Sequence, residues 1–195
     1  TEPPFQDAFA AYDASKALSF AATKEFIRKN KPLFDVIHIL PSIVLGRDDT
    51  VRQVSSFIKG TNGVLIAPLL GQARDFQIIG STVHVSDVAE MHVLALDPKI
   101  RGNQDFLAAA EDTIDWADSF DIVKRRYPEE CEKGIFKVDE RSLLPPTKPT
   151  RVDSSKARSV LGIKFKTFEE QVVSVFDHFF ELRSQEANME SSLDA

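Results

Sequence analysis

The sequence predicts an α/β protein built on a parallel sheet. Residues 7–29 are rich in Ala, Phe, Leu, Lys and Glu and contain no Gly or Pro, which favours a long helix that Asn30 and Pro32 end. The next segment, FDVIHIL (34–40), is short, β-branched and almost continuously apolar, as a parallel strand covered on both faces would be. A helix followed by such a strand is half of an α/β unit.

The bulk composition indicates a globular protein and argues against several classes. Of the 195 residues 43% are apolar, enough for a sizeable core. The net charge of −6 and the scattered basic residues argue against a nucleic-acid binder. Cys131 is the single cysteine, so no internal disulfide can form and a reducing compartment is indicated. Without an apolar run of about 18 residues or a leader-like start, we expect no membrane span and a soluble, cytoplasmic protein.

The middle of the chain is predicted to alternate loops with short elements. Pro41 and Gly46 mark a loop, residues 51–59 form a helix, and GTNG (60–63) is a turn. TVHV (82–85) predicts a second strand. The stretch between that turn and this strand mixes apolar runs with Pro and Gly and stays ambiguous.

After this strand, Ser86 or Asp87 is placed to cap the helix VAEMHVLALD. Helical spacing puts Val88, His92, Ala95 and Leu96 on one face of it. His84 and His92 have no Cys or carboxylate cluster at ligand spacing, so we expect no metal site.

The last part of the chain is predicted to be mainly helical after one more strand. DFLAA (105–109) is the expected strand, and a helix runs from near Thr113 to Pro128. SSKARSVLG (154–162) has a Ser at the N-cap position and Gly162 just past its end. FEEQVVSVFDHFFEL (168–182) is an amphipathic helix, and the polar residues 184–195 are expected to be a frayed tail.

Tyr12 and Lys16 are the candidate catalytic residues. Four residues apart on a helix, they present a hydroxyl and an ammonium to one small volume. A nearby cation favours the phenolate and lowers the pKa of a tyrosine, which suits a general acid for a carbonyl oxygen that receives a hydride. A Tyr and a Lys at this spacing also occur by chance, so the surrounding sequence has to support the catalytic interpretation.

Four segments resemble the second half of an extended short-chain dehydrogenase/reductase, closest to the carbonyl and dihydroflavonol-type reductases. They are YDASKALSFAATKEFI, FDVIHILPSIVLG, STVHVSDVAEMHVLALD and VDSSKARSVLGIKFKTFEEQVVSVFDHF, in the family's order and spacing. The resemblance implies that Tyr12 is the proton donor and Lys16 the ribose-binding lysine. It also implies that Pro41 and Ser42 close over the nicotinamide, with Ile43 and Val44 near the nicotinamide or the substrate. The family more often has Asn or Asp where Leu40 stands.

The resemblance further implies a C-terminal portion of a Rossmann-type fold with a small, mainly helical substrate side. Residues 1–100 would be part of the NAD(P)-binding domain, with substrate-side segments interleaved from about 48–80. Residues 101–183 would be the substrate-side region and 184–195 a disordered tail. The eight glycines form no dinucleotide-binding fingerprint, so the Gly-rich half and the family's catalytic Ser would lie before Thr1.

The resemblance implies an NAD(P)H-dependent oxidoreductase that reduces a ketone or aldehyde, with NADP(H) preferred over NAD(H) by analogy. The apolar segment FIKGTNGVLIAPLLG favours a small hydrophobic carbonyl substrate. A sugar-nucleotide epimerase or dehydratase, using the same Tyr and Lys, is one alternative. A non-catalytic cofactor-sensing or scaffold relative is another. The family's helix-bundle pairing makes a homodimer an open option.

We predict that the isolated 195-residue chain binds dinucleotide poorly and has little or no reductase activity. The expected strand at 34–40 needs parallel neighbours, and this chain supplies few, so apolar surface and a strand edge should be exposed. Isothermal titration calorimetry with NADPH measures the binding, and tight binding would contradict the prediction.

Overall fold

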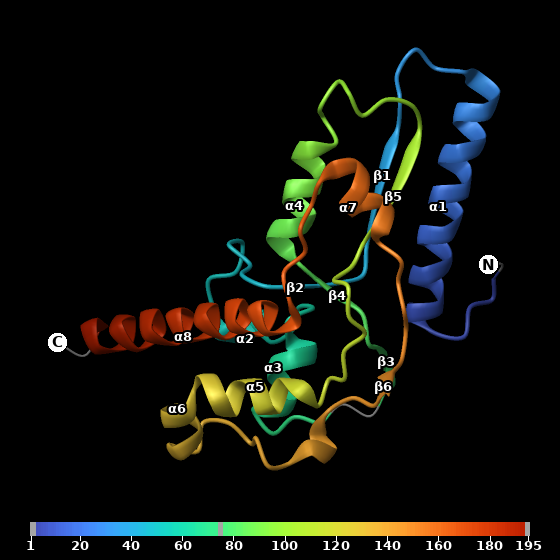
Figure 1. Ribbon diagram of the computed structural model, residues 1–195. Helices are drawn as coiled ribbons and strands as arrows, with labels where there is room; N and C mark the ends of the chain where they lie inside the picture. The colour runs from blue at the N-terminus through green and yellow to red at the C-terminus, as the bar shows by residue number, and fades with distance from the viewer. Residues whose placement is uncertain (1–2, 74–75, 194–195) are drawn as a thin grey trace. The chain divides into compact units, whose positions relative to one another are not determined.

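The chain divides into two compact units, one that ends at Val36 and one that begins at Ile37. The computed structural model describes residues 3–73 and 76–193. Its elements are labelled along the chain in Figure 1. The first unit contains one helix, and the second contains strands interleaved with helices.

The first unit is organised by one long helix, α1 (Ala8–Asn30). Asp7 caps its start, because the Asp7 carboxylate accepts a hydrogen bond of 2.7 Å from the Ala10 N–H. Lys31 ends it in the left-handed conformation, with φ of 44°, and donates its backbone N–H to the Ile27 carbonyl. The predicted helix is therefore confirmed to within one residue at each end.

The second unit contains three pairs of parallel strands. The pairs are β1 (Ile37–Pro41) with β5 (Gln104–Ala108), β2 (Ile43–Leu45) with β4 (Thr82–His84), and β3 (Ile78–Ile79) with β6 (Thr147–Lys148). In Figure 1, β1 and β5 run side by side and β2 continues from the end of β1. The predictions of a parallel strand at 34–40 and of a strand at 105–109 are confirmed, although β1 begins only at Ile37.

The predicted loop from Pro41 to Gly46 is wrong. Pro41 is the last residue of β1, and only Ser42 separates it from strand β2. The chain bends at Ser42 and exchanges one parallel partner, β5, for another, β4. Proline is tolerated here because it closes a strand that has β5 as its one partner among the described residues. Pro41 and Gly46 indicate a loop from the sequence, but the residues between them form a strand because β4 is available as a pairing partner.

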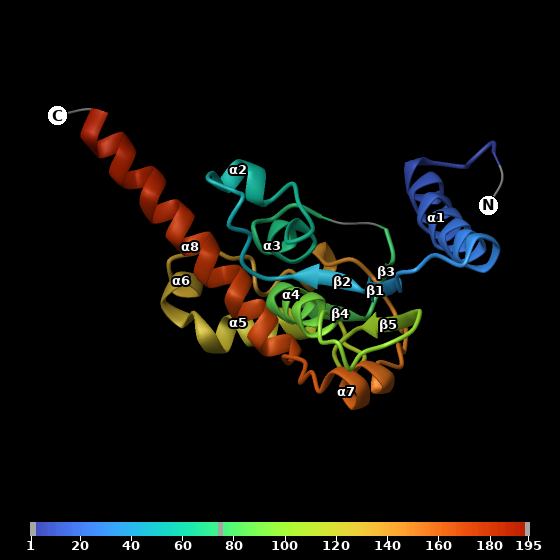
Figure 2. The ribbon, with the colours of Figure 1, turned by 90° about the horizontal axis from the view of Figure 1, so that it is seen from above.

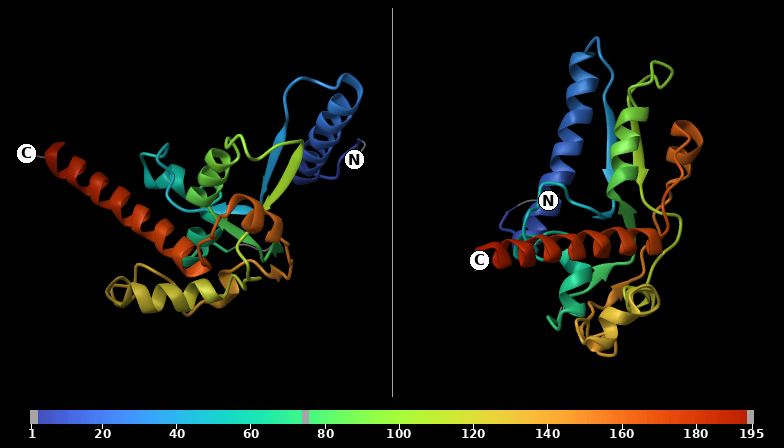
Figure 3. Two further views of the ribbon diagram at one scale, coloured as in Figure 1. Left: turned by 45° about the horizontal axis from the view of Figure 1, so that its top comes forward. Right: turned by 90° about the vertical axis from the view of Figure 1, so that its left-hand side faces the viewer.

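Helices surround these strands. They are α2 (Val54–Phe57), α3 (Gly63–Leu69), α4 (Val85–Leu94), α5 (Asp118–Arg126), α6 (Pro128–Glu132), α7 (Ser155–Leu161) and α8 (Phe168–Leu193), with a 3₁₀ turn at Arg141–Leu143. The helix expected at 51–59 shrinks to one turn, and the helix expected from Thr113 begins only at Asp118. Helix α5 packs against α8 (Figures 1 and 3).

Helix α8 continues to Leu193, so residues 184–193, expected as a tail, are helical. The reason is tertiary contact. Leu182 is fully buried in the core, and Glu186 accepts a hydrogen bond of 2.9 Å from the N–H of Val54, the first residue of α2. Figure 2 shows the length of α8 beyond the strands. Residues 194–195 of the expected tail lie outside the described residues.

The expected cap of α4 is also wrong. His84 occupies the N-cap position, and its side chain accepts a hydrogen bond from the Ser86 N–H. Asp87 instead is completely buried. Met91, one turn later, is also buried, whereas His92 and Leu96 are exposed. The buried side of α4 thus includes Asp87, which has its partner on a distant segment.

That partner is Lys166, which lies just before α8. The Asp87 carboxylate accepts hydrogen bonds from the Lys166 backbone N–H, at 2.8 Å, and from its ammonium, at 2.7 Å. A buried carboxylate is tolerated only when its oxygens are paired. The ion pair therefore joins the start of α4 to the start of α8, across 79 residues of sequence.

At the N-terminus of α7, the side chains of Ser154 and Asp153 have different hydrogen-bond partners. Ser154 occupies the predicted N-cap position, but its hydroxyl donates to the Ala109 carbonyl at 2.8 Å and makes no cap bond. The neighbouring Asp153 accepts the Ser155 N–H instead. Gly162 follows the helix with φ of 72°, as the predicted C-terminal stop requires.

Two hydrophobic clusters pack on the strands. The large cluster contains Trp116, Phe120, Phe176 and Phe179, with Ile43 and Leu45 of β2 packed into it. The small cluster contains Val83, Met91, Phe106, Ala108, Ala157, Leu161 and Ile163, with Val44 packed against it. Successive residues of β2 thus face alternate clusters, as a strand with two covered faces does.

Apolar surface remains exposed, as the sequence predicts. Leu107 of β5 is 41% exposed, and among the described residues β1 has β5 as its one strand partner. In the part of the chain that the structure describes, none of the helices combines the length and the apolar character that a membrane span requires.

Replacing Lys166 with Met should destabilise the fold by about 2–3 kcal/mol, because the buried Asp87 carboxylate would lose its cation. Met retains most of the aliphatic stem, so the loss reports the charge. The free energy of unfolding from urea denaturation measures it. The matched control is Lys164→Met, two residues earlier and exposed, which should change stability by no more than about 0.5 kcal/mol. Equal effects of the two variants would contradict a structural role for the ion pair.

Candidate functional site

Tyr12 and Lys16 lie on one face of α1, as their spacing predicts. The Lys16 ammonium lies over the Tyr12 ring, 5.2 Å from its centroid. Tyr12 is 57% exposed, so its hydroxyl can be reached by another molecule. Between them, the Ser15 hydroxyl donates to the Tyr12 carbonyl at 2.7 Å and is thereby committed to the helix backbone.

Pro41, Ser42, Ile43 and Val44 belong to the second unit, at the bend between β1 and β2. The Ser42 N–H donates to the Ala108 carbonyl at 2.9 Å, and its hydroxyl donates to the Ser81 carbonyl at 2.7 Å. Ser42 therefore connects the end of β5 with the residue that precedes β4. Its hydroxyl hydrogen is used within the fold, while Pro41 is exposed.

Ile43 and Val44 are half-buried and point to opposite sides of β2, Ile43 to the large cluster and Val44 to the small one. Both therefore have a packing role. Val44 also lines a hollow of about 400 Å³. Residues that follow β2 line the same hollow.

The hollow lies beside the loop that runs from the end of β2 to α2. Its apolar lining comes from Val44, Val51, Phe57 and Val85, and its polar rim from Arg47, Asp48, Asp49, Thr50, Ser56, Thr61 and Asn62. The lining is therefore mixed, with apolar side chains and several polar groups.

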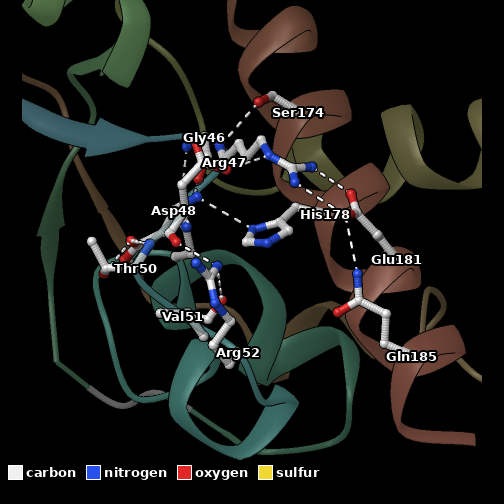
Figure 4. A network of polar contacts seen from close by, with 12 residues as sticks. Gly46, Arg47, Asp48, Thr50, Val51, Arg52, Ser174, His178, Glu181 and Gln185 are labelled. Carbon is white, nitrogen blue, oxygen red and sulfur yellow. Dashed lines mark hydrogen bonds and ion pairs between the residues drawn. The ribbon is translucent and has the colours of Figure 1, made fainter.

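Three consecutive backbone amides hold the loop at its start (Figure 4). The Gly46 N–H donates to the Asn62 side-chain oxygen at 3.1 Å. The Arg47 N–H donates to the Ser174 hydroxyl at 3.1 Å, and the Asp48 N–H donates to Nδ1 of His178 at 3.2 Å. The Asn62 amide also donates to the Gly46 carbonyl at 2.7 Å. The backbone at this point is thus determined by side chains from outside the loop.

Gly46 is required where the loop leaves β2. Its φ is 133°, a conformation that residues with a side chain rarely adopt. A Cβ here would come within 2.9 Å of Val85, 3.1 Å of His84 and 3.3 Å of Ser174. The glycine therefore allows β2, α4 and α8 to approach one another.

Comparison with known proteins gives relatives over the whole chain, although no family model matches it. The ketoreductase CTB6 of Cercospora beticola is 35% identical, over 100% of this chain and 55% of that protein. The NAD-dependent epimerase/dehydratase ALT6 of Alternaria alternata is 30% identical, over 86% of this chain and 50% of its own length. The yeast methylglyoxal/isovaleraldehyde reductase Gre2, solved with NADPH, superposes with a TM-score of 0.69 at 20% identity, over 92% of this chain and 53% of its own.

The chain belongs to the extended short-chain dehydrogenase/reductase family. The resemblance inferred from the four sequence segments is confirmed, and so is the α/β fold of the Rossmann-type reductases. The chain spans about half the length of the curated relatives it matches, 55% and 50% of the two named here. Half-length coverage agrees with the C-terminal part that the order of the segments predicts.

The site residues expected for this family fall into two groups. Tyr12 and Lys16 come together on α1, in the first unit, and Pro41 to Val44 come together at the bend, in the second unit. Their roles toward a cofactor belong to the proposal below.

Sequence reasoning missed the residues that hold the wall of the hollow. Asn62, in the segment GTNG, was interpreted only as part of a turn, yet it is 8% exposed and pairs with Gly46. Ser174, His178 and Glu181 lie at helical spacing in α8, where a polar stripe on an otherwise apolar face was the available signal.

His84 illustrates the electrostatics near the end of β2. Nδ1 of His84 accepts from the Ser86 N–H, so the ring proton of the neutral form sits on Nε2. Burial lowers the pKa of His84, and the nearby Asp87 carboxylate opposes that shift. The neutral ring is therefore the form that the fold stabilises. Among residues 3–73 and 76–193, no group of three or more His, Cys, Asp or Glu side chains is arranged to hold a metal ion.

Replacing Asn62 with Asp should destabilise this family member by about 2 kcal/mol, because the Gly46 carbonyl would lose its donor and face a carboxylate. The change keeps the size of the side chain and the acceptor for the Gly46 N–H. Chemical denaturation measures the loss, and Thr61→Ala, at the exposed neighbouring position, is the control. An unchanged stability of the Asn62 variant would show that the hydrogen bond donated to the Gly46 carbonyl contributes nothing.

Proposed function

We propose that the complete protein is an NADPH-dependent reductase of ketones or aldehydes in which Tyr12 donates the proton. The observation that carries the proposal is the Tyr12 and Lys16 pair on one face of an exposed helix, directly before the strand that ends at Pro41. The similar proteins support it, since they include ketoreductases and a reductase solved with NADPH.

The residues present fit a dinucleotide on two counts. The Tyr12 side chain is more than half exposed, and Pro41 is exposed beside the half-buried Ser42. When bound, NADPH supplies the hydride. Lys16 is proposed to bind the ribose hydroxyls, and Pro41, Ser42, Ile43 and Val44 are proposed to form the surface against the nicotinamide.

In the proposed reaction Tyr12 acts as the general acid. As the carbonyl carbon receives the hydride, the carbonyl oxygen gains negative charge, and the Tyr12 hydroxyl transfers its proton to that oxygen. The Lys16 ammonium, on the same helix face, stabilises the negative charge left on the tyrosine oxygen. In the reverse direction the same pair removes the proton from an alcohol.

The proposed substrate is a small hydrophobic carbonyl compound that enters the hollow beside Val44. The apolar segment FIKGTNGVLIAPLLG does not itself support this substrate class, because Leu65, Ile66 and Leu69 of α3 are completely buried in the core. The support for a hydrophobic substrate is the apolar part of the lining of the hollow, which comes from Val44, Val51, Phe57 and Val85.

The rim of the hollow also argues against a nucleotide-sugar substrate, which needs cations for its diphosphate. The Arg47 guanidinium, which lies on the rim, already pairs with the Glu181 and Asp49 carboxylates. A small carbonyl substrate has no diphosphate and therefore needs no cations on the rim.

Two variants of the complete protein test the proposal. Tyr12→Phe removes only the hydroxyl and should lower kcat by about 10²–10⁴-fold while NADPH affinity is nearly unchanged. Lys16→Met should lower both kcat and NADPH affinity. The chain offers a matched control, since Lys24 lies over the Phe20 ring at 4.7 Å in the same i,i+4 arrangement.

Lys24→Met should therefore leave both constants unchanged. Steady-state kinetics and calorimetry supply the numbers. Undiminished turnover by the Tyr12 variant would assign the proton to another group.

A further inference from the structure

Helix α8 presents one polar stripe to the loop that follows β2. Ser174, His178 and Glu181 are spaced four and three residues apart, so they lie on one face of α8. Ser174 and His178 accept the backbone N–H groups of Arg47 and Asp48, and Glu181 binds the Arg47 guanidinium (Figure 4).

The three contacts are expected to contribute different free energies to holding the loop. Arg47 and Glu181 are 45% and 43% exposed, and an exposed ion pair contributes about 0–1 kcal/mol. His178 is 2% exposed, so its hydrogen bond to the Asp48 N–H has little competition from water. Losing the partner of a buried backbone group costs about 1–3 kcal/mol. We therefore expect the histidine bond to contribute more than the Arg47–Glu181 ion pair to holding the loop against α8.

His178 also touches a second part of the wall. Its ring meets the Phe57 ring edge to face, with centroids 5.0 Å apart and an interplanar angle of 79°. Phe57 and Asp48 both line the hollow. One buried side chain thus supports an apolar residue of α2 and a polar residue of the loop, from behind the surface that a ligand would meet.

We propose that His178, in its neutral form, is a positioning residue that sets the width of the hollow and so selects its ligands. The role in substrate selection rests on the proposed function, whereas the role in holding the loop does not. Nδ1 must accept from Asp48, so the neutral ring carries its proton on Nε2. A protonated ring has no acceptor at Nδ1, and the Asp48 N–H would lose its partner.

The charges around His178 make this contact sensitive to pH. Burial lowers the pKa of His178, and the Arg47 guanidinium lowers it further, while Glu181, Asp49 and Asp48 oppose them. The folded-state pKa thus lies below the ordinary value of about 6.5. The contact is complete above that ordinary value and is lost as pH falls through the lower folded-state pKa.

Amide hydrogen exchange of Asp48 in the complete protein tests the proposal without relying on catalysis. His178→Leu removes the acceptor and should lower the protection factor of the Asp48 amide by about tenfold near neutral pH. His178→Gln retains an acceptor oxygen and should restore most of the protection. The wild-type protection factor should fall as pH decreases below about 6.5, whereas that of His178→Leu should not.

His92→Leu, at an exposed histidine of α4, is the control and should behave as the wild type. An Asp48 protection factor that is unchanged in His178→Leu, or that ignores pH in the wild type, would overturn the proposal. If the leucine variant does not fold, the glutamine variant and the wild-type pH series still decide it.

Kinetics then test substrate selection, with isovaleraldehyde as the probe. His178→Leu should raise KM for this aldehyde by about three- to tenfold and leave kcat within about twofold, because it alters binding and leaves Tyr12 in place. An unchanged KM would remove the selection role. A wild type that does not reduce isovaleraldehyde or other small carbonyl compounds would count against the proposed function, while the exchange result would still judge the loop.

Discussion

The exchange of strand partners at Ser42 is the constraint on which the second unit depends. Before Ser42 the chain is paired with β5, and after it with β4, so a single residue has to satisfy two neighbours. Its backbone N–H binds the end of β5 and its hydroxyl binds the residue before β4. The short strand that follows can then bury Leu45 on one side and cover Val44 on the other.

Helix α8 provides the second organising element, and it acts through polar contacts as much as through its apolar face. Val172, Val175, Phe176 and Phe179 are buried in the large cluster, which holds the helix against α5. The polar stripe on another face reaches the loop after β2, and Glu186 caps the start of α2. One long helix thus fixes both the loop after β2 and the start of α2 by hydrogen bonds.

The proposed chemistry separates proton transfer from ligand selection. The Tyr12 and Lys16 pair needs only a helix, because residues four apart share a face whatever surrounds them. Ligand selection needs a shaped wall, and the wall of the hollow comes from β2, the loop after it, α2, the segment before α3 and the start of α4. Relatives that share the pair can therefore differ in substrate through the residues that hold this wall.

Several features could be predicted from the sequence because local interactions encode them. The bounds of α1 follow from helix propensity and from Asp7, the Tyr12 and Lys16 contact follows from spacing, and the order of four segments identifies the family. Strands at 37–41 and 104–108 follow from apolar runs, though their limits shift by a few residues.

Only the tertiary structure decided that residues 43–45 form a strand, that His84 and not Asp87 caps α4, and that α8 continues past residue 184. The physical reason is the same in each case. The deciding partners are distant in sequence: β2 pairs with β4, Asp87 is held by Lys166 across 79 residues, and Glu186 of α8 accepts from the Val54 N–H across 132 residues. Hydrogen bonds over such separations depend on how the elements pack, and no local spacing reveals them.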